Sequence, residues 1–372
     1  MQTNSINMGN IPAVSVTEAV TKLSDMYSGF IHKGMCLSHV PSVMLWGPPG
    51  IGKSQAVLQI ADRLTADTGK KVSITDIRLL LYNPVDLRGI PTADKDRTTA
   101  VWLRPQIFDL DPCNDVVNIV FLDEISAAPQ SVQAAAYQIT LDHKIGEHKL
   151  PDNCIVIAAG NRVTDKSVAF KMPKALSNRM MHLEIDSSAE DWNTWAVGRG
   201  INEKIIGFLS FRPDYLMCFD SSNDELAYPT PRSWEMASII LNTVSDDIDE
   251  VFTLLAGIIG SGVAAEIRSW AKIYDRLPSI KDIFNGRMPG IPQGIDTLYA
   301  LISAMTGYAK DHKDELNGIG NAIAYANNMP PDFSTVFVKN LMSIEEDYKL
   351  TLMQIPEFMQ WIRTRGKLLN GI

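Results

Sequence analysis

Between residues 43 and 185, short apolar runs alternate with longer stretches in which apolar positions recur at helical spacing. Residues 43–46 form one apolar run, and a glycine-rich turn at 47–52 separates it from a predicted helix. Further strands are predicted at 71–77, 118–122, 154–159 and 181–185. The runs 119–122 and 155–159 are continuously apolar, which is typical of parallel strands covered on both faces. The pattern therefore predicts an α/β domain built on a parallel sheet.

After residue 186 the pattern becomes helical up to the C-terminus. Helices are predicted at 190–199, 204–210, 231–244 and 251–270, and then at 298–310, 314–327 and 356–369. A stretch rich in proline and glycine, 278–294, separates the two groups and is predicted to be a linker or hinge. We therefore expect a flexible N-terminus at 1–19, an α/β domain at 20–186, a helical domain at 187–275 and a helical C-terminal extension at 276–372.

Composition and charge limit the classes of partner. The chain is 45% hydrophobic and 21% charged, with a formal net charge of −9. A negative surface repels phosphate backbones, which disfavours a nonspecific nucleic-acid binder, although a local basic channel remains compatible with an acidic total. The four cysteines are scattered without a CxxC pair, which predicts reduced thiols rather than zinc ligands. No signal-peptide pattern or apolar run of ~20 residues is visible, so we expect a soluble, cytoplasmic protein without a membrane anchor.

Residues 47–54 read GPPGIGKS and match the phosphate-loop pattern GxxxxGK[ST], between a predicted strand and a predicted helix. Glycines let backbone N–H groups converge on phosphate oxygens, and the helix N-terminus adds partial positive charge. Lys53 is predicted to neutralise the β- and γ-phosphates of ATP, and Ser54 to offer its hydroxyl to Mg²⁺. The predicted nucleotide-binding residues are Gly47, Pro48, Pro49, Gly50, Ile51, Gly52, Lys53, Ser54 and Gln55.

Two carboxylates, Asp123 and Glu124, directly follow the apolar run 119–122. In open parallel sheets, ligands bind at the carboxyl ends of the strands. Asp123 is predicted to hold the metal, directly or through water, and Glu124 to orient and polarise the attacking water. An isolated Asp-Glu pair would indicate a solvated loop or a helix cap. Its place after a buried strand, downstream of a phosphate loop, favours ATP hydrolysis instead.

The GPPGxGKS loop, the strand that ends in Asp123 and Glu124, and the sequence AAGN at 158–161 together resemble an AAA+ ATPase. The resemblance covers roughly residues 40–275, and it implies a P-loop core followed by an α-helical lid domain. In that family the asparagine that ends the fourth strand is called sensor 1, and Asn161 matches it. The resemblance implies that the Asn161 amide hydrogen-bonds the γ-phosphate or the lytic water; a simple turn residue is the alternative.

Three arginines are candidates for contacts with the nucleotide. The segment 172–179 resembles the family stretch in which an arginine reaches the γ-phosphate of the neighbouring subunit, so Arg179 is the predicted arginine finger. Arg162 lies beside sensor 1 and is a competing candidate that the sequence leaves open. Arg232, near the start of a predicted lid helix, matches the position called sensor 2, although the helix dipole there disfavours a cation modestly.

Two insertions resemble those of MoxR-type AAA+ proteins. In 83–105, two semi-apolar arms flank a polar tip at 92–98, as in a β-hairpin, and this matches the helix-2 insert of that group. A second predicted hairpin, 143–152, precedes the sensor 1 strand. Neither is required for ATP chemistry, so contact with a client protein and packing between subunits are both open.

The resemblance also implies partners. An arginine supplied by a neighbour requires a homo-oligomeric ring, for which we expect a hexamer. MoxR-type relatives act as chaperone-like remodellers, commonly beside proteins with a von Willebrand factor A domain, so a partner of that kind and a protein client are expected. One alternative is the motor of a restriction or phage-defence complex, with Lys95 and Arg97 lining a basic pore. Another is a nucleotide-gated scaffold, which the intact pair Asp123 and Glu124 disfavours.

Overall fold

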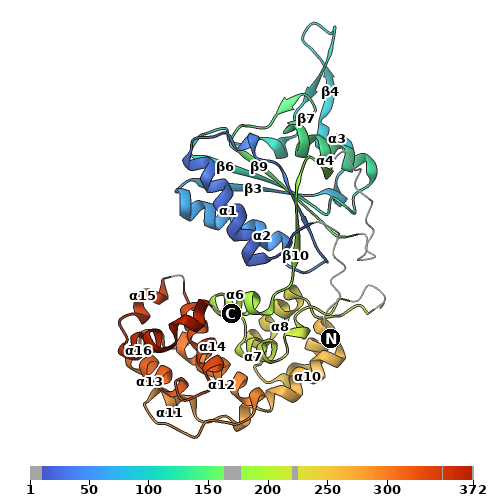
Figure 1. Ribbon diagram of the computed structural model, residues 1–372. Helices are drawn as coiled ribbons and strands as arrows, with labels where there is room; N and C mark the ends of the chain where they lie inside the picture. Colours follow the sequence, from blue (N-terminus) through green and yellow to red (C-terminus); the bar gives the residue numbers. More distant parts are fainter. Residues whose placement is uncertain (1–10, 163–176, 220–224, 346, 371–372) are drawn as a thin grey trace. The chain divides into compact units, whose positions relative to one another are not determined.

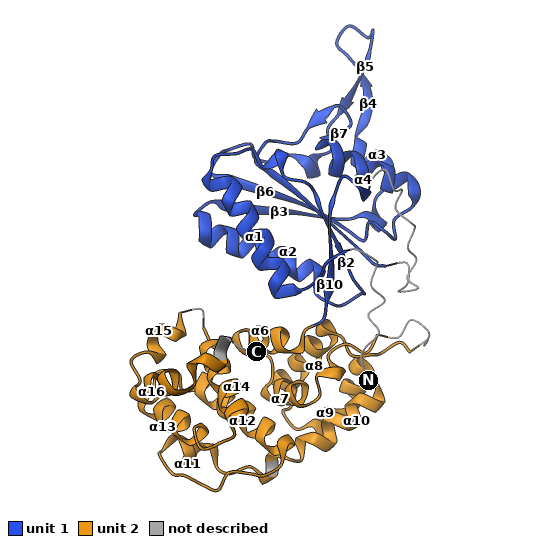
Figure 2. Ribbon diagram, viewed as in Figure 1, with its two compact units in different colours: residues 1–187, 220–222 blue, residues 188–219, 223–372 orange. Residues whose placement is uncertain are grey.

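The structure is a computed structural model that describes residues 11–162, 177–219, 225–345 and 347–370. The chain divides into two compact units, which we describe one at a time (Figures 1 and 2). Unit 1 comprises residues 1–187 and 220–222, and unit 2 comprises residues 188–219 and 223–372. The finer domain boundaries expected from the sequence stay predictions.

A six-stranded parallel sheet forms the centre of unit 1, in the order β1-β10-β2-β9-β6-β3 (Figure 1). Its strands are β1 (Ala13–Ser15), β2 (Val43–Trp46), β3 (Lys71–Arg78), β6 (Val116–Asp123), β9 (Cys154–Gly160) and β10 (Met181–Asp186). The parallel sheet predicted from the apolar runs is confirmed.

Strand β1 differs from what the sequence predicts. The prediction of a flexible segment at 1–19 does not hold for residues 13–19, because Ala13–Ser15 pairs with residues 184–186 of β10. The Ser15 hydroxyl then accepts a hydrogen bond from the Glu18 N–H and caps helix α1 (Val16–His32). Three residues are too few to show a strand periodicity, so the pairing becomes visible only in the folded sheet.

Both faces of the sheet are covered, because successive side chains of each strand point to opposite sides. On β2, Leu45 packs with helices α1 and α2 (Lys53–Thr68). Met44 and Trp46 belong to a second apolar cluster, which also contains residues of α3 (Pro84–Arg88) and α4 (Gln130–Asp142). Met44 and Leu45 are fully buried, and burial of such side chains stabilises the fold by about 1.5–3 kcal/mol each. Short 3₁₀ turns complete unit 1, at Leu37–His39, Leu79–Leu81 and Gln106–Phe108.

The two predicted hairpins are confirmed as antiparallel pairs outside the main sheet. Strands β4 (Ile90–Ala93) and β5 (Ala100–Leu103) form the first, which projects from unit 1 (Figure 1). Strands β7 (Lys144–Ile145) and β8 (His148–Lys149) form the second. Gly89, at the foot of the first hairpin, has φ +89° and ψ −172°, a conformation that is open to glycine and essentially to no other residue.

The described part of unit 2 consists of helices and loops. The helices are α6 (Ala189–Arg199), α7 (Glu203–Phe211), α8 (Pro231–Thr243), α9 (Ile248–Ile259), α10 (Ser261–Ala271), α11 (Ile280–Phe284), α12 (Ile295–Asp311), α13 (Leu316–Ala326), α14 (Pro331–Met342), α15 (Tyr348–Leu352) and α16 (Pro356–Arg365), with 3₁₀ turns at Pro213–Tyr215, Tyr274–Arg276 and Gly366–Asn370.

Two apolar clusters hold unit 2 together, and they share helices. Phe208 and Trp234 lie in one cluster, and Phe337 and Trp361 lie in the other. Helix α7 contributes to both, and so does α12, which packs against α7. The stretch 278–294, expected to be a linker, contains α11, whose Ile283 and Phe284 are buried in the second cluster.

The backbone at Gly89 generates a test of the hairpin. A Cβ at this position would lie 1.9 Å from the Leu103 carbonyl oxygen, so Gly89→Ala should lower the free energy of unfolding by about 3 kcal/mol or more. Gly69→Ala is the matched control, because Gly69 also has a positive φ, +67°, but no described atom lies within 4 Å of its Cβ site. Its cost should be about 1–2 kcal/mol. Urea denaturation measures both, and equal losses would contradict the steric argument.

Candidate active site

The candidate site lies where three adjacent strands of unit 1 end. Strand β2 pairs with β9, and β9 pairs with β6, so the three carboxyl ends meet at one edge of the sheet. Trp46, the last residue of β2, lies opposite Gly160, the last residue of β9. The predicted phosphate loop, the Asp123–Glu124 pair and Asn161 each continue from one of these ends. The topology therefore brings together groups that lie up to 114 residues apart in the chain.

The loop after β2 has a backbone that requires glycine. Gly50 has φ +79° and Gly52 has φ +111°, both in the region where a Cβ is strained. Gly52 is also the N-cap of α2, and no described side chain caps this helix. The first N–H groups of α2 therefore face the loop, where a phosphate can accept their hydrogen bonds and interact with the helix dipole.

Lys53 is the first residue of α2, and its side chain turns back over the loop. Its ammonium group donates to the carbonyl oxygens of Gly47 at 2.7 Å and Pro48 at 3.0 Å. It also donates to Asn161 Oδ1 at 3.0 Å, across to the end of β9. The residue is only 8% exposed, so these acceptors replace water around a buried charge. The geometry thus places a cation beside Asn161 at the centre of the phosphate loop.

Ser54 and Asp123 form the second contact across strand ends. The Ser54 hydroxyl donates to Asp123 Oδ2 at 3.1 Å, and the Glu124 N–H donates to Asp123 Oδ1 at 2.9 Å. Glu124 has φ +58°, an uncommon conformation for a residue with a side chain, and such strain occurs often at functional sites. Hydroxyl and carboxylate oxygens suit Mg²⁺, which binds through few protein ligands together with phosphate oxygens and water.

A second carboxylate lies near this metal position. Burial, followed by repulsion from Asp123, raises the pKa of Asp76 on β3, while the neighbouring Arg78 opposes the shift. Within residues 11–162, 177–219, 225–345 and 347–370, no three His, Cys, Asp or Glu side chains are grouped so as to hold a metal ion. The Ser54 hydroxyl and the Asp123 carboxylate fit a Mg²⁺ ion that arrives with its phosphate ligands and water.

Ser126 positions Asn161 and was not predicted from the sequence. The buried Ser126 hydroxyl accepts a hydrogen bond from the Asn161 N–H at 2.9 Å. A Cβ on Gly160 would lie 2.9 Å from the same hydroxyl oxygen, so the residue before Asn161 must be small. A serine two residues after the acidic pair carries no periodic signal, and only its contact with Asn161 reveals its role.

The three candidate arginines lie in different environments. Arg162 forms an ion pair with Glu184 of β10, and their side chains are only 18% and 5% exposed. Arg179 is exposed and lies in the turn before β10, while residues 172–176 of its predicted motif lie outside the described part of the chain. Arg232 is exposed in the first turn of α8, in unit 2, where Thr230 and Ser233 form a capping box.

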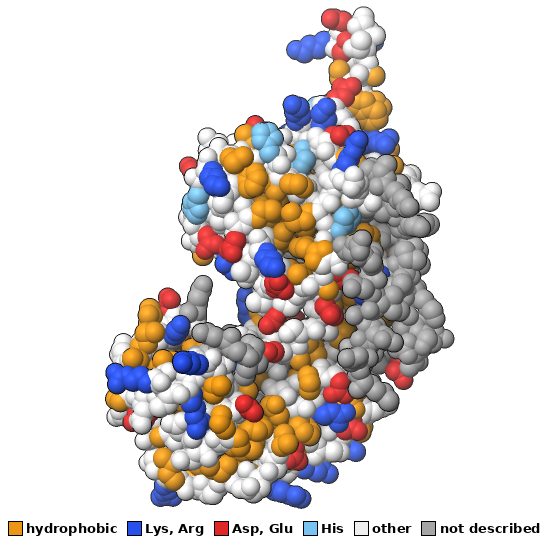
Figure 3. Space-filling view, viewed as in Figure 1, with side chains coloured by type: hydrophobic (Ala, Val, Ile, Leu, Met, Phe, Trp, Pro, Cys, Tyr) orange, Lys and Arg blue, Asp and Glu red, His pale blue; other side chains and the backbone are white. Residues whose placement is uncertain are grey.

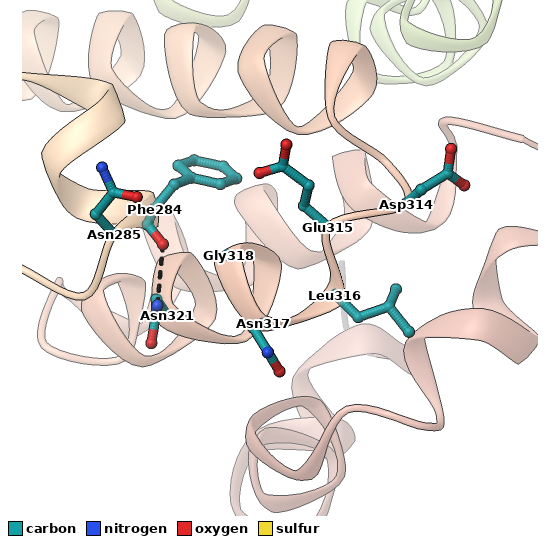
Figure 4. Close-up of a pocket in the computed structure, with 8 residues that line it drawn as sticks. All are labelled: Phe284, Asn285, Asp314, Glu315, Leu316, Asn317, Gly318 and Asn321. Carbon is teal, nitrogen blue, oxygen red and sulfur yellow. Dashed lines mark hydrogen bonds between the residues drawn. The ribbon is translucent and has the colours of Figure 1, made fainter.

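Unit 2 contains a separate cavity of about 640 Å³, shown in Figure 4. It is lined by Phe284, Asn285, Asp314, Glu315, Leu316, Asn317, Gly318 and Asn321. The Asn321 amide donates to the Phe284 carbonyl oxygen at 2.9 Å on one wall of it. Its two ionisable residues are both acidic, and carboxylates repel phosphate, so this cavity does not compete with the strand ends as a nucleotide site.

Comparison with known proteins agrees with the geometry of unit 1. Residues 42–182 match a protein family described as the ATPase family associated with various cellular activities (AAA). The matched part contains the phosphate loop, the Asp123–Glu124 pair, Asn161 and Arg179. The matched part is similar to that family and has a P-loop ATPase fold: the chain binds ATP with Mg²⁺ and hydrolyses ATP to ADP and phosphate.

Solved structures resemble the chain more distantly. A variant of RuvB from Thermotoga maritima is 16% identical, with 78% of this chain and 84% of that chain covered at a TM-score of 0.36. The HORMA:CdnC:Trip13 complex of E. coli MS115-1 contains a chain that is 17% identical, with 62% and 83% covered at a TM-score of 0.35. NtrX from Brucella abortus, in complex with ADP, is 10% identical, with 95% and 69% covered at a TM-score of 0.32. A search of curated proteins found no match.

Among the described residues, none of the helices combines the length and apolar character that crossing a bilayer requires.

The ion pair at β10 generates a stability test. Glu184→Gln removes the negative charge beside Arg162 with little change in shape, and it should lower the free energy of unfolding by about 1–3 kcal/mol. Asp25→Asn is the matched control, because Asp25 forms an ion pair with Arg63 in which both side chains are more than a third exposed. Its loss should stay below about 1 kcal/mol. Thermal and urea unfolding report both values; equal effects would show that the burial of Glu184 adds nothing.

Proposed function

We propose that the chain is a ring-forming AAA+ ATPase of the MoxR-like group that remodels a protein client. The observation that carries this proposal is a hydrogen bond between the two hairpins, in which His148 Nε2 lies 2.8 Å from the Trp102 carbonyl oxygen. The second hairpin, β7–β8, lies in the chain between Glu124 and Asn161. A structural change at Glu124 or Asn161 can therefore be transmitted to the projecting hairpin β4–β5 through the contact between His148 and Trp102.

The surface of the projecting hairpin supports contact with a protein. Its strands, and the 3₁₀ turn Leu79–Leu81 and helix α3 that precede them, expose large apolar side chains, namely Leu80, Leu81, Val85, Ile90, Val101 and Leu103. Figure 3 shows hydrophobic side chains at the foot of this projection and charged ones at its tip. Exposed apolar groups that cluster in this way are typical of protein-binding surfaces, because their burial by a partner is favourable.

The proposed hydrolysis follows from the strand-end contacts. Lys53 and the first N–H groups of α2 would bind the β- and γ-phosphates, and Ser54 with Asp123 would hold Mg²⁺, which would supply neutralisation of phosphate charge. Glu124 orients and polarises the attacking water, and Asn161 holds the γ-phosphate or that water. Asn161 already contacts Lys53, so a γ-phosphate would be shared by two groups that come from different strands.

Further positive charge at the nucleotide is proposed to come from arginines. Arg162 is paired with Glu184 inside its own chain, whereas Arg179 is exposed, so Arg179 is the proposed finger for the neighbouring subunit. Arg232 is the proposed nucleotide contact from unit 2. A finger supplied by a neighbour requires a closed ring, which we propose to be a hexamer. The resemblance to MoxR-type proteins further suggests a partner with a von Willebrand factor A domain.

A nucleic-acid motor is the second candidate. The tip of the projecting hairpin carries Lys95 and Arg97, but also Asp94 and Asp96. A side-chain hydrogen bond from Thr99 and then the Thr98 N–H lower the pKa of Asp94 to about 2, so its carboxylate stays charged at neutral pH. A tip with both signs favours a protein over a phosphate backbone. Strong stimulation of the ATPase by DNA would reverse this preference.

Two substitutions separate nucleotide binding from turnover. Lys53→Ala should weaken ATP binding by roughly 10- to 100-fold, because a charge-assisted contact with phosphate is lost. Glu124→Gln should bind ATP normally and lower kcat by roughly 10²- to 10⁴-fold, because the group that polarises the water is gone. Fluorescent-nucleotide titration and phosphate release measure the two effects. Wild-type turnover in Glu124→Gln would show that the base is another residue.

The trans-acting arginine predicts a concentration dependence. The ATPase rate per subunit should rise as the ring assembles, as followed by mass photometry at increasing protein concentration. Arg179→Ala should assemble and bind ATP but lose roughly 10³-fold in rate, because the transition-state charge is no longer neutralised. Arg199→Ala, which removes an exposed arginine at the end of α6, is the control and should behave as wild type. An equal rate per subunit in monomer and ring would exclude a trans-acting finger.

A further inference from the structure

His182 connects the strand of the phosphate loop to the turn that carries Arg179. It lies on β10, next to Trp46 of β2, and the two rings stack at 17° with their centroids 6.1 Å apart. Trp46 Nε1 donates to His182 Nδ1 at 2.9 Å. On the other side of the ring, His182 Nε2 lies 2.6 Å from the Ser177 carbonyl oxygen. One imidazole thus contacts both the end of β2 and the turn that leads into β10.

The hydrogen bonds with Trp46 and Ser177 determine which ring nitrogen of His182 carries the hydrogen. An indole N–H can only donate a hydrogen bond, so His182 Nδ1 must accept with its lone pair. A carbonyl oxygen can only accept, so Nε2 must carry the hydrogen. The network therefore assigns the neutral tautomer with its proton on Nε2. A second proton on Nδ1 would place two donors face to face and break the contact with Trp46.

Both contacts lead directly to the ATPase machinery. Trp46 is the residue immediately before Gly47, the first residue of the phosphate loop. The Ser177 carbonyl oxygen also accepts the Met180 N–H at 3.4 Å, which closes the turn Ser177–Met180 with Arg179 inside it. That bond is long and weak, so the bond from His182 is the stronger of these two restraints on the turn. The turn that contains Arg179 is therefore bonded to an imidazole that also contacts the phosphate-loop strand.

We propose that His182 is a positioning residue that holds the Arg179 turn in register with the phosphate loop, through its Nε2–H bond to Ser177. This inference rests on the proposed role of Arg179 as the trans-acting finger. The ring itself touches no nucleotide; it acts by restricting the directions in which the exposed Arg179 can point. A subunit built in this way aligns the arginine it presents to its neighbour with its own nucleotide site.

Three substitutions at His182 separate this role from simple packing. His182→Gln places an amide N–H near the position of Nε2 and keeps the bond to Ser177. His182→Asn places an amide oxygen near the position of Nδ1 and keeps only the bond from Trp46. His182→Phe keeps a flat ring against Trp46 and loses both bonds. Packing alone predicts that Phe is tolerated best, whereas the positioning role predicts that Gln is.

The experiment measures ATP affinity, assembly and kcat of the assembled full-length protein for each variant. We expect ATP affinity and assembly close to wild type in all three, with kcat within about twofold for Gln and roughly 3- to 10-fold lower for Asn and Phe. If His182→Phe does not fold, the comparison of Gln with Asn still decides, because each keeps one bond. A kcat for Asn or Phe equal to that of Gln would overturn the role of the Ser177 bond.

A double-mutant cycle with Arg179→Ala tests whether His182 acts through the arginine. The proposal expects that His182→Asn lowers kcat in the wild-type background and changes nothing once Arg179 is alanine. If the two losses multiply, His182 acts elsewhere and the positioning role fails, while the finger stands. If Arg179→Ala alone keeps full kcat, the proposed finger fails, and the positioning role fails with it.

Discussion

A buried ammonium group determines how the active end of the sheet is arranged. Removing the charge of Lys53 from water costs several kcal/mol unless acceptors surround it, and here they are two loop carbonyls and the Asn161 amide. The phosphate loop and the end of β9 must therefore both reach Lys53 Nζ, which requires β2 and β9 to be neighbours. Strand β6 is next in order and brings Asp123 to Ser54. The parallel strand order thus brings to one edge of the sheet the acceptors that the buried charge of Lys53 requires.

Much of this arrangement can be predicted from the sequence, because its signals are local. The five longer strands of the sheet are predicted from strand-like segments, three of which contain continuous apolar runs, and the glycines of the loop show where the backbone takes positive φ. The arms of the projecting hairpin are predicted because a polar tip separates two semi-apolar segments. The site residues around Lys53 follow from the rule that parallel strands bring their carboxyl ends to one edge. Each of these inferences needs only a few consecutive residues.

The features that escaped prediction depend on contacts between distant parts of the chain. Trp46 and His182 are 136 positions apart, and Ser126 and Asn161 are 35 apart, so neither pair leaves a periodic trace in one sequence. The ion pair between Arg162 and Glu184 escapes prediction for the same reason, since only the fold shows that β10 brings Glu184 against Arg162. A proline- and glycine-rich composition likewise predicts a linker at 278–294, although tertiary packing draws α11 into the core of unit 2.

The position of β10 also governs how the sheet can form during synthesis. In the sheet, β1 pairs with β10, and Ser15 lies opposite Asp186. The first strand therefore cannot pair until about 170 further residues have been synthesised. At ribosomal rates of about 5–20 residues per second, that delay is on the order of 10–30 s. During this time β2 also lacks its neighbour on that side, and its edge can pair with other chains. The strand that pairs with both β1 and β2 is thus the one that covers this exposed edge of the nascent sheet.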